Sequence, residues 1–379
     1  MGATFDTIVI GLGGVGSATA CALASQNVRT LGIDQFTPPH SRGSSHGETR
    51  IIRKAYFEHP SYVPLLLRSY ELWSQLELLT EQKLFHRTGL LEIGPNDGIV
   101  VPGVLLSAAT HGLDVETMSM SEAQRRFPGI DGDLAWSVLL EHDAGYLKVE
   151  ECVSTYLQQA RMLGAELKVD EVVVDWQSRG EAVVVRTNKD EYQARSLVIA
   201  AGPWASQALA RYRLPLRIVR KYQYWFRGRT HCYRQDLGFP CYFYETPQGY
   251  FYGFPELDGS GMKVARHSGG DVVQPPIDGQ HPVDDNDRML VESFLERHLP
   301  QIDPDCLQSK GCYYTMTPDE NFIVDRLPDA PNVTVVAGLS GHGFKFTSVL
   351  GEIAACLSIG RNSPCPIDFL SLHRFEGTR

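Results

Sequence analysis

Three glycines near the N-terminus have the spacing of a nucleotide-binding turn. Gly11, Gly13 and Gly16 follow the apolar run Thr7–Ile10 and precede an alanine-rich stretch, Ser17–Ser25, that we expect to be helical. In this pattern the first glycine permits a tight turn, the second lets backbone approach a pyrophosphate, and the third lets helix and strand pack closely. The helix N-terminus then faces the anion. The spacing therefore predicts a dinucleotide site.

An acidic residue follows the next predicted strand, Thr30–Ile33. A carboxylate at Asp34 can accept hydrogen bonds from an adenosine ribose, and it would repel a 2′-phosphate. A tight βα turn without a ligand is the alternative interpretation. At this point the motif leaves FAD and NAD open.

Cationic side chains elsewhere could bind or activate small molecules. Arg50 and Arg53 are three positions apart, so in a helical turn both guanidinium groups would address one side. Both follow a loop, residues 37–49, whose glycines and hydroxyl groups suit contact with an anion or a ring edge. Lys263 and His267 are four positions apart and would face the same side of a strand. A plain surface loop and a solvated strand lysine are the alternatives.

Two kinds of predicted structure carry these groups. Valine-rich strands between residues 166 and 201 end at a glycine turn, and Asn332–Gly338 is a similar strand that ends at a second one. Because these strands lie far from Gly11 in the sequence, the nucleotide-binding domain is predicted to be discontinuous. Between them, Leu214–Val273 alternates aromatic residues with turns, which indicates an antiparallel sheet. Its aromatic face could be core or the wall of an apolar pocket. Helices are predicted at Tyr62–Leu76, Ser121–Phe127, Val149–Leu163, Asp284–His298 and Phe346–Leu357.

Composition limits the classes of function. The chain has 379 residues, of which 43% are hydrophobic and 21% charged, with a formal net charge of −10. These values are typical of a soluble globular protein and give no support for nucleic-acid binding. No apolar run approaches the roughly 20 residues of a membrane span, and no signal peptide is recognised. Eight cysteines without a C-x-x-C pair argue against a zinc site or a disulfide framework and predict a reducing cytoplasm.

Several motifs together resemble the monomeric sarcosine oxidase family of flavoprotein amine oxidases, which includes N-methyltryptophan and pipecolate oxidases. The matching stretches are Ile8–Gly16, His40–Tyr56, Tyr250–Pro255, Gly261–His267, Gly311–Asp325 and Ala337–Gly351. The resemblance implies an α/β (α+β) fold of the glutathione-reductase type. A discontinuous Rossmann-like FAD-binding domain would comprise residues 1–85, 149–213 and 320–379. A substrate domain with a large mixed or antiparallel sheet would comprise residues 86–148 and 214–319.

The resemblance also implies roles for particular residues. FAD would be joined through its 8α-methyl group to the sulfur of Cys312. Arg53 and Lys345 match the pair that binds the substrate carboxylate, and two fixed cations would orient an amino acid. Lys263 matches the lysine that activates oxygen, where a cation would stabilise superoxide as it forms.

Other candidates surround these residues. His46 and Arg50 match residues beside the flavin ring, while Tyr252, His267 and Tyr314 match polar residues around the substrate. None is assigned as an obligatory base, although His46, Arg50, Lys263 and His267 are the catalytic candidates. The predicted cofactor contacts are Gly11, Gly13, Gly14, Val15, Gly16, Asp34, Gln35, Ser41, Arg42, Ser44, Ser45, Arg50, Val172, Ala201, Gly202, Trp204, Cys312, Gly338, Gly341, Gly343, Phe344 and Lys345.

Two positions depart from the sarcosine oxidase pattern. Ser45 stands where sarcosine and N-methyltryptophan oxidases usually have a second histidine, and this serine is more similar to pipecolate oxidase. Phe243 stands where sarcosine oxidase has a flexible methionine over the substrate. The prediction is therefore an FAD-dependent oxidase of secondary amino acids, either N-methylated or cyclic, with O2 as acceptor and H2O2 as product. A free carboxylate on the substrate and a monomeric protein are expected. Alternatives are a fructosyl amino acid oxidase, an amine dehydrogenase with another acceptor, a non-catalytic nucleotide-binding protein and an NAD-dependent dehydrogenase.

Overall fold

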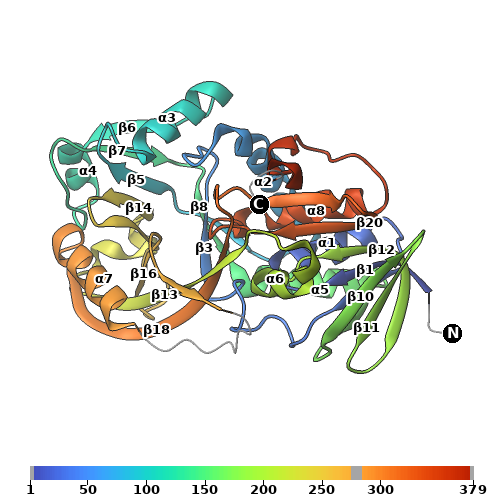
Figure 1. Cartoon of the computed structure of the whole chain (residues 1–379). Helices are drawn as coiled ribbons and strands as arrows, with labels where there is room; N and C mark the ends of the chain where they lie inside the picture. Colours follow the sequence, from blue (N-terminus) through green and yellow to red (C-terminus); the bar gives the residue numbers. More distant parts are fainter. Residues whose placement is uncertain (1–3, 275–283, 376–379) are drawn as a thin grey trace.

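A computed structural model describes residues 4–274 and 284–375 (Figure 1). Its elements form two lobes, each built on one large sheet. Every helix predicted from the sequence is present, with ends that differ by a few residues. The observed helices are α1 (Gly14–Ala24), α2 (Val63–Thr80), α3 (Val100–His111), α4 (Met120–Arg126), α5 (Val149–Met162), α6 (Ala205–Ala208), α7 (Asp285–His298) and α8 (Thr347–Ser358).

The first sheet has eight strands and a parallel centre. Strand β1 (Thr4–Ile10) lies between β2 (Thr30–Ile33) and β12 (Glu191–Ile199). β9 (Glu166–Lys168) extends the sheet beside β2, and β20 (Ala330–Ala337) extends it beside β12. Parallel strands are buried on both faces, which explains the uninterrupted apolar runs in β1 and β20. Segments from both ends of the chain therefore complete one nucleotide-binding sheet.

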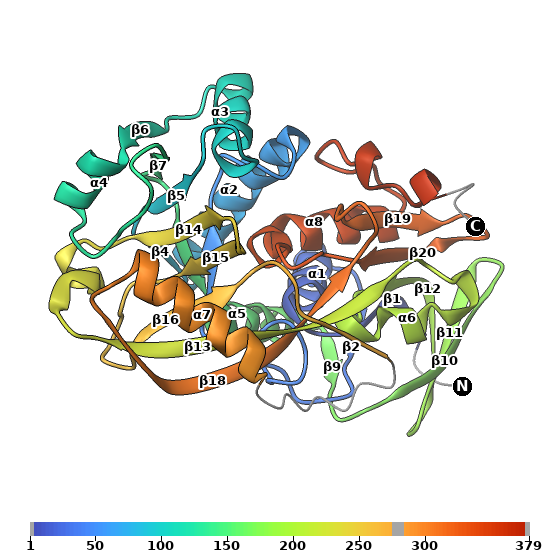
Figure 2. The same ribbon diagram turned by 60° about the vertical axis from the view of Figure 1, so that its left-hand side comes forward.

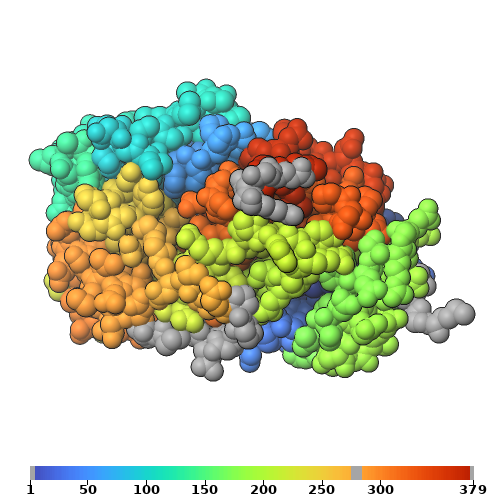
Figure 3. Space-filling view, viewed as in Figure 1, coloured from blue at the N-terminus to red at the C-terminus, as the bar shows by residue number. Residues whose placement is uncertain are grey.

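Antiparallel strands and helices finish this lobe. β10 (Val173–Arg179) and β11 (Ala182–Thr187) continue from β12, and β19 (Ile323–Leu327) pairs with β20. Helix α1 packs against both α5 and α8. In the space-filling view, the blue N-terminal segment around α2 adjoins the red C-terminal elements (Figure 3). There Arg68 of α2 forms an ion pair with Glu352 of α8 at 2.6 Å.

The second sheet has nine strands and is largely antiparallel. Its strands are β5 (Leu90–Gly94), β6 (Glu116–Ser119), β7 (Ser137–Glu141), β13 (Arg217–Gly228), β14 (Cys241–Thr246), β15 (Gly249–Gly253), β16 (Met262–Arg266), β17 (Asp271–Val273) and β18 (Ile302–Met316). The long pair of β13 and β18 crosses the base of the lobe, and α7 packs against β16 and β18 (Figure 2). Together with the parallel sheet, it confirms the predicted fold class.

The aromatic strands serve both functions considered from the sequence. Tyr242, Tyr244 and Phe251 belong to a buried core cluster, and Phe251 stacks on Phe294 of α7 at 4.4 Å between ring centroids. Successive strand residues face opposite sides of the sheet. Phe243 and Tyr252 therefore lie on the other face, where they border a cavity. The alternation of side chains along each strand, and not the amino-acid composition, determines which aromatic rings lie in the core and which border the cavity.

A third, three-stranded sheet contains Arg50, whereas Arg53 directly follows its first strand. Arg50 lies in β3 (Thr49–Ile52), which pairs with β8 (Gly145–Lys148), and β8 also pairs with β4 (Phe85–Arg87). Arg50 and Arg53 do not share the helical turn that was considered for them, because Ile51 and Ile52 favour a strand. Since residues three apart on a strand face opposite sides, the two guanidinium groups make separate contacts, which are described below.

Candidate active site

A cavity of about 650 Å³ lies between the elements of the two lobes. It is bordered by the glycine turn after β1, the turn after β20, the cavity face of β14 and β15, and the chain around β3. Asp34 borders it on the nucleotide side, while Arg53 and Phe243 border it on the side of the second sheet. The space therefore connects the predicted dinucleotide turn with the predicted substrate residues.

The glycine turn is sterically closed to larger side chains. Gly11 has a φ of +87°, and a Cβ there would lie 2.5 Å from the carbonyl oxygen of Ala200. A Cβ on Gly16 would lie 1.7 Å from the carbonyl oxygen of Gly11, so the close helix–strand packing requires glycine. The carboxylate of Asp34 accepts the backbone N–H of Leu12 at 2.7 Å. Asp34, directly after β2, thus braces the turn, and its contact with the ribose stays a prediction.

The polar loop before β3 joins this turn to the second sheet. Ser45 accepts the N–H of Gly14 at 3.0 Å, while Ser44 donates to the carbonyl of Tyr313 at 2.6 Å. Arg50 donates to the carbonyl oxygens of Ser44 and Thr49. Ser44, Ser45 and Arg50 all border the cavity. Their hydrogen bonds hold this loop in place along the cavity, as its sequence suggested.

Arg53 is buried and paired with two carboxylates. Its Nη2 donates to both oxygens of Glu58 at 2.7 and 2.6 Å, and its Nη1 donates to Glu92 at 3.3 Å. The guanidinium carbon also lies 4.6 Å from the ring centre of Tyr56 and 4.4 Å from that of Phe57. Glu58 therefore occupies Nη2, one of the two nitrogens through which an arginine binds a carboxylate bidentately.

Lys345 is the second buried cation. Its Nζ donates to the carbonyl of His342 at 2.9 Å. Burial, reinforced by the charge of Arg53, lowers the pKa of Lys345 to about 7. His342 donates from Nε2 to the carbonyl of Glu320 and therefore accepts the Tyr56 hydroxyl hydrogen at Nδ1, at 2.5 Å. The lysine is thus held beside a fixed, neutral histidine.

Aromatic and neutral polar groups close the same end. His267 approaches the hydroxyl of Tyr314 at 3.3 Å, and its ring lies 5.8 Å from that of Phe243 between centroids. Burial, with the charge of Lys221, lowers the pKa of His267 to about 3, so the imidazole is neutral at physiological pH. This end can therefore bind an anion at its cations and an uncharged group near His267.

Lys263 lies behind the cavity wall. Its Nζ donates to the carbonyl oxygens of Gly47 and Thr49 at 2.5 and 2.8 Å, and to the Thr49 hydroxyl at 3.1 Å. Burial and then the charge of Arg50 lower the pKa of Lys263 well below its usual value. His267, which follows the last residue of β16, borders the cavity instead. The two residues therefore do not share one environment.

Cys312 is buried in β18, directly opposite Lys221 of β13. The side-chain amide of Gln223 donates to its sulfur at 3.4 Å. Its chain neighbours Tyr313 and Tyr314 border the cavity, whereas Cys312 lies outside the lining. Polar neighbours distinguish this thiol from an ordinary apolar core cysteine.

Most predicted site residues border the cavity, and the structure adds others. Those outside the lining are Gly16, Ser41, Arg42, His46, Lys263 and Cys312. Glu58, Glu92 and His342 were missed by the sequence reasoning. Glu58 lies within the same segment as Arg53, and Glu92 is a lone acid in an otherwise apolar strand; the latter is a sequence signal that could have been noticed.

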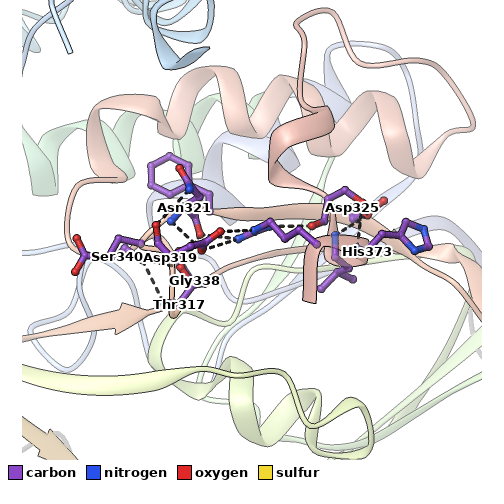
Figure 4. Close-up of polar contacts among 12 residues, drawn as sticks. Thr317, Asp319, Asn321, Asp325, Gly338, Ser340 and His373 are labelled. Carbon is purple, nitrogen blue, oxygen red and sulfur yellow. Dashed lines mark hydrogen bonds and ion pairs between the residues drawn. The ribbon is translucent and has the colours of Figure 1, made fainter. Parts of the chain in front are cut away.

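A polar network holds the turn after β20 against the C-terminal segment (Figure 4). Ser340 accepts the backbone N–H of Thr317 at 3.2 Å, and Asp319 accepts from Arg374 at 2.8 Å. Asp325 of β19 accepts the hydroxyl of Ser371 at 2.6 Å. These bonds fix the base of the turn that carries Lys345.

Comparison with known proteins identifies the family. The model of the FAD dependent oxidoreductase family matches residues 6–357. The chain belongs to this family of FAD-dependent oxidoreductases. The oxidoreductase is 40% identical over 380 residues to monomeric sarcosine oxidase of Streptomyces avermitilis, covering 99% of this chain and 98% of the relative. It is 36% identical to N-methyl-L-tryptophan oxidase of Yersinia pestis, covering 98% and 100% respectively. The predicted resemblance is confirmed.

A solved structure agrees on the fold. The oxidoreductase superimposes on NikD, an unusual amino acid oxidase essential for nikkomycin biosynthesis, with a TM-score of 0.86 at 24% identity, covering 98% of each chain.

Residues of the cavity also fit FAD. Gly11, Gly13 and Gly14 of the glycine turn border the cavity with no side chain of their own, and the cavity continues from there to the cations. Among residues 4–274 and 284–375, no metal-holding group of His, Cys, Asp or Glu is found, and no helix could cross a membrane.

Proposed function

We propose that this oxidoreductase oxidises the C–N bond of secondary amino acids to an imine and passes the electrons to O2, giving H2O2. The observation that carries the proposal is the pair of buried basic side chains, Arg53 and Lys345, that border the same cavity as the glycine turn. The names of the relatives support N-methyl amino acids as the substrate class. A cyclic amino acid such as pipecolate or proline is equally compatible with the lining.

The residues would act by binding and orientation. Arg53 and Lys345 would hold the carboxylate, and the rings of Phe243 and Tyr252 would confine the α-carbon and the amine. The nearby cations favour the unprotonated form of the substrate amine, because a further positive charge on the amine would be repelled by them. His267 is neutral, so it would lie beside that amine without protonating it. FAD, when bound, supplies the two-electron acceptor.

Anaerobic flavin bleaching tests the proposal. Sarcosine, N-methyltryptophan, pipecolate, proline and a glycated lysine are each mixed with the holoenzyme without oxygen. At least one of the first four is expected to bleach the flavin, and admission of air should restore the colour and release H2O2. Bleaching by glycated lysine alone would indicate a fructosyl amino acid oxidase. Slow recolouring in air after fast bleaching would indicate a dehydrogenase, and no bleaching by any compound would contradict the proposal.

We also propose that the flavin is covalently attached at Cys312. The thiol is supported by the hydrogen bond from Gln223, and the buried ammonium of Lys221 lies on the opposite strand position. Both groups give the sulfur polar neighbours, and the adjacent Tyr313 and Tyr314 border the cavity.

Replacing Cys312 with serine should therefore remove the tether. Acid-precipitated wild-type protein is expected to keep its yellow colour in the pellet, whereas Cys312→Ser should release the colour or lack it. Cys241→Ser is the matched control, because Cys241 is equally buried in the same sheet. Free flavin in the wild-type supernatant would contradict the assignment.

The proposed domain division remains 1–85, 149–213 and 320–379 against 86–148 and 214–319. It is supported by the two large sheets, whose strands come from these segments, although β8 joins β3 and β4 in the small sheet. A monomer in a reducing cytoplasm is also proposed. The eight unpaired cysteines support the reducing compartment.

A further inference from the structure

A buried carboxyl group touches Arg53 from inside the second sheet. Glu92 lies in β5 between Leu139 of β7 and Phe243 of β14, and its residue is 0% exposed. One carboxyl oxygen accepts from Arg53 Nη1 at 3.3 Å, while the other has no hydrogen-bond partner among the described residues. A second carboxylate, Glu58, already takes both bonds from Nη2. Two acids therefore contact the cation that would bind a substrate anion.

The two acids differ in their freedom to move. Glu58 lies on the loop after β3, and its side chain is 19% exposed. It can turn away when a ligand carboxylate takes its place. Glu92 is fixed by its strand and by the apolar residues on either side, so it stays in contact with Arg53 whether or not a ligand is bound.

We propose that Glu92 is a positioning residue: in its protonated, neutral form it holds Arg53 in place, and when it ionises it weakens the binding of the substrate carboxylate. This inference rests on the proposed function. As a neutral acid, Glu92 accepts a hydrogen bond from Nη1 and directs Nη2 at the ligand, and it leaves the charge of Arg53 unopposed. As a carboxylate, it cancels that charge and repels the ligand.

The groups facing Glu92 decide between these forms. Arg53 and Lys345 favour the ionised form, whereas Glu58 and Glu141 of β7 disfavour it. Burial outweighs the attraction and raises the pKa of Glu92 to about 8. The neutral form therefore prevails below that pH, and ligand affinity should fall as pH rises through it.

Calorimetric titration of the holoenzyme with methoxyacetate tests whether the ionisation of Glu92 weakens carboxylate binding. The compound has an ether oxygen in place of the amine and cannot form an imine, and its neutral amide is the control ligand. The variants are Glu92→Gln, which keeps a neutral acceptor, and Glu92→Leu, which removes it. Glu77→Gln is the matched control protein, because Glu77 caps the amides of Leu84 and Phe85 outside the cavity lining.

Wild type and Glu92→Gln should bind methoxyacetate equally at pH 6.5, and Glu92→Leu about tenfold more weakly. Above pH 8 the wild type should lose affinity relative to Glu92→Gln by about tenfold per pH unit. Lys345 has a pKa of about 7, so above pH 8 the ratio of the two dissociation constants reports mainly on Glu92. KM should follow the same pattern while kcat changes little.

Two results would overturn the inference alone: a ratio that stays constant from pH 6.5 to 9.5, or equal binding by Glu92→Leu and wild type at pH 6.5. Should the leucine variant fail to fold, the glutamine variant still decides the question. If the wild type does not bind methoxyacetate at any pH, the cavity has no carboxylate-binding site. That result would contradict both the proposed function and this inference.

Discussion

Replacing Lys263 with methionine is expected to slow the reaction of the reduced enzyme with O2 by about 10²- to 10³-fold. The first electron transfer to oxygen creates superoxide, and a nearby ammonium stabilises that anion. Burial lowers the pKa of Lys263, and an anion forming beside it raises that pKa again. Stabilisation of superoxide by Lys263 requires the lysine to carry its proton when this negative charge develops. Methionine is of similar length and cannot do so.

Stopped-flow measurement of the two half-reactions separates this role from a structural one. Anaerobic reduction by substrate should change by only a few-fold, because Lys263 lies outside the cavity lining. Lys310→Met is the matched control: Nζ of Lys310 also lies near the ring of Trp225, and it donates to Glu48 outside the cavity lining. Equal slowing of both half-reactions, or equal slowing of reoxidation in the control, would count against oxygen activation by Lys263.

Local spacing was enough to predict the nucleotide half of the site. Gly11, Gly16 and Asp34 act through contacts between neighbouring strand, turn and helix, and such contacts depend on short-range geometry. The long apolar and valine-rich strands were predicted for the same reason. The order in which distant strands pair cannot be derived from such spacing, and it came from the resemblance to a family.

The substrate half was predicted less completely because its contacts join distant segments. The partners of Arg53 include Glu92, 39 positions away, and no periodicity connects them. The short run around Arg50 also lacked enough residues to distinguish a helical turn from a strand. A buried acid is recognised from the sequence only as a lone charge in an apolar strand, and its partner has to be found in the fold.

Replacing Arg53 with alanine is expected to weaken binding of methoxyacetate by about 10²-fold. Each hydrogen bond from a charged donor contributes about 1.5–3 kcal/mol, and the bidentate face provides two. The variant should still fold. Glu58 can turn toward water, and Glu92, whose pKa is about 8 even beside Arg53, stays protonated when that cation is lost. Binding of the neutral amide should hardly change, and unchanged binding of methoxyacetate would place the anion elsewhere.

Glu58→Gln provides the opposite test of the same site. In the structure Glu58 holds the two bonds from Nη2 that the ligand carboxylate needs, so a ligand must displace one anion to bind. Glutamine retains the shape but has no charge, and methoxyacetate should bind it about tenfold more tightly than wild type. Opposite changes in the two variants identify Arg53 as the anion site that Glu58 occupies. Weaker binding in both would mean that Glu58 supports the site without competing for it.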